Sequence, residues 1–239
     1  MIKNLKEKYI KKLFIYHIYR YFKYKISYSK SYGATGEDVL LNKIFNQTNG
    51  FFLDIGALHP INGSLTYNLY KRGWKGFNFD IVEKNIRLFD TFRKRDTSIK
   101  IAISSKKGFI NSYIFGSGSG LNTLEKKWAD KWSNIINQKY VINKIKKTTL
   151  SEILKKYKIP KKVELLNIDV EGHELDVLKG INFKNFRPKI ITVEIHVENT
   201  KEIFTTPVYK ILEKANYQLI SQYYHTSFFK AEEFSIKEL

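Results

Sequence analysis

The sequence predicts an α/β protein whose mostly parallel sheet carries helices on both faces. Short runs that are apolar on both sides of a strand alternate along the chain with amphipathic helical segments. Strands of that kind are typical of a parallel sheet buried between two layers of helices. The last segment, residues 217–231, has two β-rich runs that meet near His225 and Thr226. These runs predict an antiparallel hairpin that closes one edge of the sheet.

Each predicted element follows from its local pattern. The strand candidates are the apolar runs at residues 51–55, 76–82, 99–104, 163–170 and 189–196. The helix candidates are residues 64–72, 83–93, 150–157, 174–179 and 207–215. Thr149 and Glu152 have capping-box spacing at the start of the third helix, and Gly73 and Gly180 follow the first and the fourth.

Composition limits the classes of protein to consider. The chain has 239 residues, 43% of them hydrophobic, which is enough for one domain with a sizeable core. It has no run of about 18 uninterrupted apolar residues, as a membrane-spanning helix requires, and no apolar leader at its start. The absence of cysteine excludes disulfides, thiolate metal sites and cysteine nucleophiles. We expect a cytoplasmic protein.

The net charge of +19 is concentrated in two segments. Residues 1–30 hold nine lysines and arginines against one glutamate, and residues 105–162 hold fourteen lysines against three acids. These segments account for the whole excess, so the rest of the chain is neutral. Two basic segments on a neutral body indicate acidic partners at particular places. The alternative is a general compositional bias toward lysine.

The two basic segments also suggest how the chain is organised. Residues 1–30 predict a basic amphipathic helix, an appendage to one larger domain at residues 31–239. Such a helix can lie on an anionic membrane, here its inner face, or pack on its own domain or on a partner protomer. Residues 105–148 are long for a connection and read as a basic insertion. Its glycine-serine stretch at 116–120 precedes an aromatic segment, which predicts a lid. The alternative is that its tryptophans only fix the insertion to the core.

The ends of the first two predicted strands indicate a nucleoside site. Asp54 and Gly56 come where the first strand ends, and Asp80 where the second ends. In an open α/β sheet ligands bind at the carboxyl ends of the strands, where a carboxylate accepts hydrogen bonds and a glycine lets the backbone approach. The stretch "DIGALHP" lacks the glycine series and the lysine of phosphate-binding loops. A nucleoside without phosphates, such as S-adenosylmethionine, fits this pattern.

At this point the sequence resembles a known family, the FkbM-like S-adenosylmethionine-dependent methyltransferases. The stretches that carry the resemblance, in the family's order, are "YGATGEDVLL" (32–41), "GFFLDIGALHPINGSLTYNLYKRGWKGFNFD" (50–80), "AISSKKG" (102–108), "SGLNTL" (119–124), "TTLSEIL" (148–154), "LLNIDVEGHELDVLKGINF" (165–183) and "RPKIITVEIH" (187–196). The resemblance implies a Rossmann-like, class I methyltransferase sheet of seven strands, mostly parallel, with a C-terminal antiparallel hairpin. It also implies S-adenosylmethionine as the cofactor.

The family's cofactor residues can be carried over by position. The resemblance implies a cofactor site made of Glu37, Asp54, Gly56, Ala57, Asp80, Ile103 and Ser104. Asp80 would hold the ribose hydroxyls, and Ile103 and Ser104 would flank the adenine. Glu37 would border the amino-acid end of the cofactor. The chain departs from the family at Leu58 and at "SLT" (64–66), where the family has Asn and "SNT".

The densest group of titratable residues follows the fourth predicted strand, in "NIDVEGHEL". Methyl transfer to a hydroxyl needs an aligned acceptor and a general base within hydrogen-bond reach. Asp169 is the first candidate for the base or for the acid that orients the substrate, and His173 is the second. Alternatively, Asp169, Glu171 and Glu174 bind a divalent cation that lowers the pKa of the hydroxyl. A third reading places Glu171 and Glu174 at a helix start, where acids are favoured.

Glu171 is also a candidate substrate contact, and further candidates come from other parts of the sequence. His59 follows the glycine turn and His196 follows the fifth strand, although a lone histidine is often only a satisfied polar residue. Glu194 is an acid inside an apolar strand and needs a partner or a site. Trp128 belongs to the aromatic segment of the insertion, where its face can stack on a sugar ring. The lysines around it suit an anionic acceptor.

The leading hypothesis is an O-methyltransferase that acts on a small-molecule or glycan substrate, namely a carbohydrate, a glycan precursor or a related metabolite, because family members commonly methylate such hydroxyls. The alternatives are a nucleic-acid methyltransferase, suggested by the charge, and a non-catalytic membrane-associated protein with the same fold. The segmental charge and the lack of an "NPPY"-like signature argue against nucleic acid. Asp54, Asp80 and Asp169 argue against a non-catalytic protein. The sequence predicts no particular oligomeric state.

Overall fold

The computed structural model describes residues 30–160 and 163–236. The chain divides into two units, residues 1–31 and 32–239, and every helix and strand reported below belongs to the second. The basic helix expected over residues 1–30, with its membrane contact, falls almost entirely outside the described residues. Within the described ranges, no helix combines the length and the apolar character that crossing a membrane requires.

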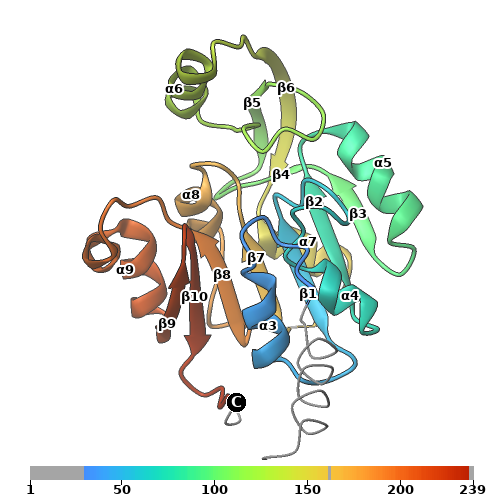
Figure 1. Cartoon of the computed structure of the whole chain (residues 1–239), viewed down its shortest axis with the longest axis vertical. Helices are drawn as coiled ribbons and strands as arrows, with labels where there is room; N and C mark the ends of the chain where they lie inside the picture. Colours follow the sequence, from blue (N-terminus) through green and yellow to red (C-terminus); the bar gives the residue numbers. More distant parts are fainter. Residues whose placement is uncertain (1–29, 161–162, 237–239) are drawn as a thin grey trace, which may run out of the picture. The chain divides into compact units, whose positions relative to one another are not determined.

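A seven-stranded sheet forms the centre of the second unit (Figure 1). In spatial order its strands are β3 (Thr97–Lys100), β2 (Lys75–Asp80), β1 (Phe51–Ile55), β7 (Leu165–Ile168), β8 (Ile190–Glu194), β10 (Thr226–Ala231) and β9 (Tyr217–Tyr223). The first five run parallel, and β10 pairs antiparallel with both β8 and β9. The predicted α/β class, the mostly parallel sheet and its C-terminal hairpin are therefore confirmed.

The register of the central strands brings their carboxyl ends to one edge of the sheet. Ile55 of β1 pairs with Phe79 of β2 on one side and with Ile168 of β7 on the other. Asp80 and Asp169 come directly after these two partners in the chain. Because parallel strands end at the same edge, the two acids lie on either side of the turn that follows β1.

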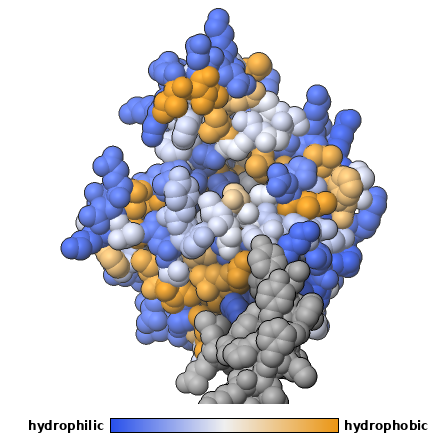
Figure 2. Space-filling model, viewed as in Figure 1, coloured by the Kyte–Doolittle hydropathy of each residue, from blue (hydrophilic) through white to orange (hydrophobic). Residues whose placement is uncertain are grey.

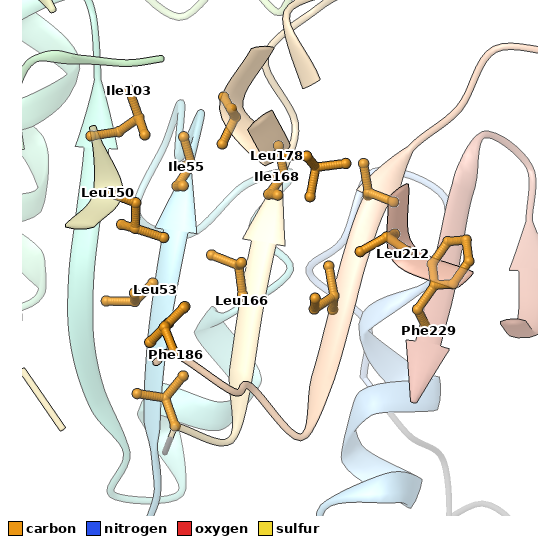
Figure 3. Close-up of a cluster of buried hydrophobic side chains, with 14 of the residues drawn as sticks. Leu53, Ile55, Ile103, Leu150, Leu166, Ile168, Leu178, Phe186, Leu212 and Phe229 are labelled. Atoms are coloured by element: carbon orange, nitrogen blue, oxygen red, sulfur yellow. The ribbon is translucent and has the colours of Figure 1, made fainter. Parts of the chain in front are cut away.

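Helices cover both faces of the sheet. They are α3 (Asp38–Ile44), α4 (Tyr67–Lys71), α5 (Glu83–Phe92), α7 (Leu150–Lys156), α8 (Glu174–Lys179) and α9 (Pro207–Lys214), with a 3-10 helix η1 (Thr200–Thr205) before α9. One buried cluster joins α7, α8 and α9 to the sheet, and Figure 3 shows part of it. A second cluster joins α3 and α4 to the opposite face. Leu53 and Ile55 belong to the first and Phe52 to the second, as the alternation of a strand requires.

Local signals in the sequence account for several helix boundaries. The hydroxyl of Thr149 accepts the backbone N–H of Glu152 at 3.3 Å, as the capping-box spacing predicts. Helix α9 begins with Pro207 at a position whose N–H has no helical partner, and the Thr206 hydroxyl accepts the N–H of Tyr209 at 3.1 Å. Helix α4 is shorter than the predicted helix at residues 64–72, because its first residues form part of a buried network described below.

Residues 105–148 form a separate small sheet with a helix. The elements are β5 (Gly108–Ile114), α6 (Lys126–Ile136) and β6 (Val141–Thr148), and the short strand β4 (Ala102–Ile103) completes the sheet in the order β4-β6-β5. In Figure 1 this insertion stands at the end of the main sheet toward which the parallel strands point. An aromatic helix was expected here, whereas β5 and β6 were not.

The strand predicted at residues 99–104 is divided between the two sheets. Strand β3 ends at Lys100, and the N–H of Ile101 donates to the carbonyl oxygen of Asp80 at 3.0 Å. Ala102 and Ile103 then pair with β6 instead of with the main sheet. This transfer links the end of β3 directly to the insertion.

Candidate active site

A cavity opens at the carboxyl edge of the main sheet, between the ends of β1, β2, β7 and β8 and the insertion. Six acids line it: Glu37, Asp54, Asp80, Asp169, Glu171 and Glu194. Its apolar lining includes Ile55, Leu58, Leu65, Phe79, Ile81, Ile101, Ile103 and Leu124. No lysine, arginine or histidine is among the lining residues in the part of the chain that the structure describes. In a chain with a net charge of +19, such a cavity favours a positively charged ligand.

Gly56 is required by the close approach of two strand ends. Its backbone has φ +88°, and a Cβ built on it would lie 1.6 Å from the carbonyl oxygen of Asp169. The N–H groups of Gly56 and Ala57 both donate to the carbonyl oxygen of Phe79, at 2.9 and 3.0 Å. The turn after β1 therefore ties β2 and β7 together at the cavity wall, and only glycine fits there.

Asp80 lines the cavity at the end of β2, and three donors hold its carboxylate. The backbone N–H groups of Leu58 and Val82 donate to it at 3.0 and 2.6 Å, and the Asn85 side chain donates at 3.2 Å. Burial nevertheless raises the pKa of Asp80 to about 6. Leu58, where the chain departs from the family pattern, has φ +51° and thereby presents its N–H to Asp80.

Asp54 reaches the cavity but directs its carboxylate into a buried network. One oxygen accepts the hydroxyl of Thr66 at 2.8 Å and the other accepts the side-chain amide of Asn167 at 2.8 Å. Burial raises the pKa of Asp54, while these hydrogen bonds and the charge of Arg93 oppose the rise. Asp54 therefore joins the ends of β1 and β7 to the "SLT" segment (64–66).

Arg93 stabilises this network without lining the cavity itself. Its side chain is fully buried, and it forms a 2.7 Å ion pair with Asp96. It also donates to the hydroxyls of Ser64 and Thr66 at 3.3 and 3.1 Å. The two hydroxyls that this chain keeps at 64 and 66 thus connect a buried guanidinium to Asp54.

The end of the cavity at β7 and β8 contains carboxyl groups that raise one another's pKa. The enclosure of Asp169 by the cavity wall, together with the negative charges of Glu194 and Glu174, raises its pKa well above the usual range. Burial and the charge of Glu174 raise the pKa of Glu194 to about 7, although a hydrogen bond from Asp169 opposes the rise. Burial and the charges of Glu194 and Asp169 raise the pKa of Glu171 to about 9. The group therefore holds protons near neutral pH.

Trp128 and His196 flank this group without being among the cavity-lining residues. The indole N–H of Trp128 donates to Glu171 at 3.1 Å, and its ring lies 4.7 Å from the imidazole of His196. His196 Nε2 is 2.9 Å from a carboxylate oxygen of Glu194. Ligand atoms of Glu171, Glu194 and His196 all lie within 4.8 Å of one another.

Glu174 has a structural role at the start of a helix, which is one of the interpretations that the sequence allowed. It begins helix α8, and its carboxylate accepts the N–H groups of Val170 and Gly172 at 3.0 and 3.1 Å. Glu171 instead lies in the preceding turn with φ +53°. That turn directs Glu171 into the cavity while Glu174 closes the turn behind it.

His173 and Ser104 were expected at the site, but neither is among the cavity-lining residues. His173 is buried, with Nδ1 2.6 Å from a carboxylate oxygen of Glu125 and Nε2 3.3 Å from the hydroxyl of Ser104. Ser104 also donates to Asp176. Both ring nitrogens of His173 are therefore occupied by contacts that join the start of α8 to the start of α6 and to the residue after β4.

His59 also lies outside the cavity lining. Its Nδ1 accepts the backbone N–H groups of Ile61 and Asn62, at 3.1 and 2.9 Å, which stabilises the turn after β1. Glu37 does line the cavity. Its carboxylate accepts the backbone N–H and the hydroxyl of Thr35, at 2.9 and 2.6 Å, so it also orders its own loop.

The glycine-serine stretch of the insertion is bonded on both sides of the cavity. The N–H of Gly118 donates to the Asn85 side chain at 3.0 Å, and Asn85 in turn donates to Asp80. On the side of β7, the hydroxyl of Thr123 donates to the carbonyl oxygen of Glu171 at 2.7 Å. Segment 119–124 contributes five lining residues between these two points, so the insertion forms one wall of the cavity.

The unpredicted residues of this site include Asn167, Arg93 and Asn85. Asn167 could have been found, because it is a polar residue within an otherwise apolar predicted strand. Arg93 and Asn85 read as ordinary polar positions of an amphipathic helix, and only the fold shows that both are buried beside the cavity.

The chain is similar to a known protein family and to several solved structures. The family model described as Methyltransferase FkbM domain matches residues 54–219. No curated protein sequence matches the chain. Solved structures that resemble it include a TehB-like SAM-dependent methyltransferase from Corynebacterium glutamicum, with 10% identity, TM-score 0.43, and coverage of 90% of this chain and 96% of that one.

Two further solved structures are similar at the same level. A precorrin-6y C5,15-methyltransferase from Geobacter metallireducens has 10% identity and TM-score 0.43, with coverage of 84% of this chain and 90% of that one. An O-methyltransferase from Bacillus cereus in complex with SAH has 15% identity and TM-score 0.38, with coverage of 96% and 98%.

Proposed function

The chain belongs to the FkbM family of S-adenosylmethionine-dependent methyltransferases, and we propose that it methylates a hydroxyl of a carbohydrate, a glycan precursor or a related metabolite. The observation that carries this proposal is the acid-lined cavity, which ends in the neighbouring carboxyl groups of Asp169 and Glu194. The acidic lining complements a positively charged cofactor, and the carboxyl pair offers a proton acceptor for a hydroxyl.

The residues of the cavity fit S-adenosylmethionine. When bound, this cofactor supplies a methyl group on a positively charged sulfur atom. Asp80, fixed by the N–H groups of Leu58 and Val82, is placed to accept from ribose hydroxyls, and Ile81 and Ile103 offer apolar walls to an adenine. The absence of basic side chains from the described lining suits a cofactor without phosphates.

Asp169 and Glu194 together provide the general base. In the reaction the acceptor oxygen forms a bond to the methyl carbon as the bond from carbon to sulfur breaks, and the hydroxyl proton passes to a carboxylate. A base works best when its pKa is close to the working pH, and the pKa of Glu194 is about 7. Asp169, at the end of β7, is then the partner that shares the proton and orients the hydroxyl.

The acceptor class follows from the side chains around this pair. Glu171, protonated near neutral pH, can both donate a hydrogen bond to an acceptor hydroxyl and accept one, and the indole N–H of Trp128 holds its side chain. The faces of Trp128 and His196 can stack on a sugar ring. The lysines of the insertion lie outside the acidic cavity, so an anionic group on the acceptor would be bound there and not beside the reacting hydroxyl.

A divalent cation is the second way to activate a hydroxyl at this place, and Glu171, Glu194 and His196 are the residues that would hold it. We favour proton transfer, because Asp169 and Glu194 are close enough to influence each other's pKa and can share a proton. Activity that survives exhaustive treatment with EDTA supports the base. Activity that EDTA abolishes and Mg²⁺ or Mn²⁺ restores would show instead that a cation activates the hydroxyl.

The test is a transfer assay with S-adenosylmethionine labelled in its methyl group. The purified protein is offered cell-derived glycans and nucleotide-linked sugars in one set, and RNA and DNA in another, with Glu194→Gln as the matched inactive control. Label on a sugar hydroxyl that depends on Glu194 supports the proposal. Label that appears only on nucleic acid would contradict it. A cytoplasmic location is proposed with this function, since sugar precursors and the cofactor are made there.

A further inference from the structure

The insertion exposes an unusual share of large apolar side chains. Of the ten large hydrophobic residues that are exposed in the described ranges, five belong to this segment. Four of them surround the turn between α6 and β6, and we call them the apolar tip: Ile135 (59% exposed), Ile136 (39%), Val141 (62%) and Ile142 (54%). Exposed apolar residues that gather at one place mark an interaction surface.

The apolar tip is a fixed feature of the fold. Asn137, with φ +53°, caps the C-terminus of helix α6, and the N–H of Gln138 donates to the carbonyl oxygen of Ser133 at 3.2 Å. The chain then runs back along the helix, where the hydroxyl of Tyr140 donates to Asp130 at 2.6 Å. Figure 2 shows an orange patch over the α6 end of the insertion with blue side chains around it.

The charge around the apolar tip is predominantly positive. The insertion, residues 105–148, contains nine lysines and two acids. Asp130 pairs with Lys126 at 2.6 Å, and Glu125 contacts His173 at 2.6 Å. Lys139, inside the tip, is exposed. A surface with exposed aliphatic side chains and uncompensated lysines complements an anionic interface.

We propose that the apolar tip docks the protein on an anionic phospholipid membrane. The aliphatic side chains enter the boundary between headgroups and acyl chains, and the lysines meet the lipid phosphates. A second copy of this chain would bring like charges together, and an acidic protein would not need four exposed aliphatic residues. The lipid surface satisfies both features at once.

Docking at this place also concerns the cavity. The same insertion forms a wall of the cavity through residues 119–124, and its helix α6 carries Trp128 against Glu171. A docked insertion would therefore deliver a membrane-bound acceptor to the acidic pair. This last step rests on the proposed function, whereas the docking itself does not.

Vesicle binding tests the docking without cofactor or acceptor. The full-length chain is sedimented with sucrose-loaded vesicles of phosphatidylcholine alone or with phosphatidylglycerol. The first variant is Ile135→Ser/Val141→Ser/Ile142→Ser, and the second is Lys139→Gln/Lys144→Gln/Lys146→Gln. The matched control is Phe92→Ser/Phe204→Ser, which removes two equally exposed aromatic residues outside the insertion. All positions are exposed, and a thermal melt checks that each variant is folded.

We expect wild type and control to bind only the phosphatidylglycerol vesicles, with affinity that falls as salt rises. Both insertion variants should bind at least about tenfold more weakly. No binding by wild type would overturn the proposal. Equal binding by wild type and the insertion variants would also overturn it and assign the affinity to residues 1–30. A dimer that the serine variant dissociates would show that a second copy covers the tip.

Discussion

At the scale of single residues, the cavity combines carboxyl groups whose protonation responds near neutral pH. Asp80, Glu194 and Glu171 have pKa values raised to about 6, about 7 and about 9, because the cavity wall removes them from water. Asp54 and Asp80 could be placed from the sequence, because strand ends are recognisable. The place of His173 could not be predicted, because the orientation of its side chain depends on the contact with Glu125 at the start of α6.

Glu194 should control the pH dependence of catalysis. Its folded pKa of about 7 means that the base is protonated below that pH and free above it. We expect kcat/KM to rise as pH rises through about 7, and Glu194→Gln to lower kcat by about 10²–10⁴ and remove the rise. Glu198→Gln, an exposed acid four residues on, is the control and should keep both. A pH profile unchanged in Glu194→Gln would exclude this role.

Glu171 should limit the stability of the free protein at high pH. Its pKa is raised in the folded state, so the unfolded chain ionises first, and the cost of keeping Glu171 protonated grows from the unfolded pKa up to about pH 9. Glu171→Gln should raise Tm by a few degrees at pH 9 and less at pH 5, since about 1 kcal/mol shifts Tm by ~2–4 °C at this size. Thermal melts at both pH values check this, and a larger gain at pH 5 would refute it.

Gly56 should tolerate no side chain. Gly56→Ala would place a methyl group against the carbonyl of Asp169, so we expect lost cofactor binding and a Tm lower by several degrees. Gly118→Ala is matched, because Gly118 has φ +73° but nothing within 4 Å of its Cβ position. Calorimetric titration and melts of both variants separate backbone strain from the clash. Equal behaviour of the two would show that the close approach is unimportant.

At the scale of elements, the insertion is the part that the sequence predicted least well. The central strands β1, β2, β7 and β8 are apolar on both faces and were recognisable, and the capping residues marked α7. Strand β6 reads "VINKIKKT", in which only Ile145 and Thr148 are buried. A strand that is mostly solvated carries no apolar run. The aromatic helix α6 was expected because Trp128 and Trp132 stand four residues apart.

His173 should hold the insertion in place against helix α8. His173→Ala removes buried contacts with Glu125 and Ser104, which should cost about 1–3 kcal/mol and increase hydrogen exchange across residues 108–148. Lys107→Ala is the control, because it breaks an exposed pair with Glu152 that contributes little. Faster exchange in His173→Ala alone fits this role. If kcat falls while exchange is unchanged, His173 is catalytic after all.

At the scale of the whole molecule, charge is separated between the cavity and the surface. The fold class and the family were predictable, because strand ends, glycines and acids recur in a fixed order along the chain. The separation of charge could not be predicted, because only the folded protein gathers acids from Glu37 to Glu194 in one cavity. A basic chain thereby offers an acidic interior to a cationic cofactor.

The most direct test of this account is a calorimetric titration of the purified protein with S-adenosylmethionine, alongside Asp80→Ala and the exposed control Asp90→Ala. We predict micromolar binding by wild type and by Asp90→Ala, and its loss in Asp80→Ala with the fold intact. Failure of a well-folded wild-type protein to bind, or unchanged binding by Asp80→Ala, would contradict the assignment of the acid-lined cavity to the cofactor.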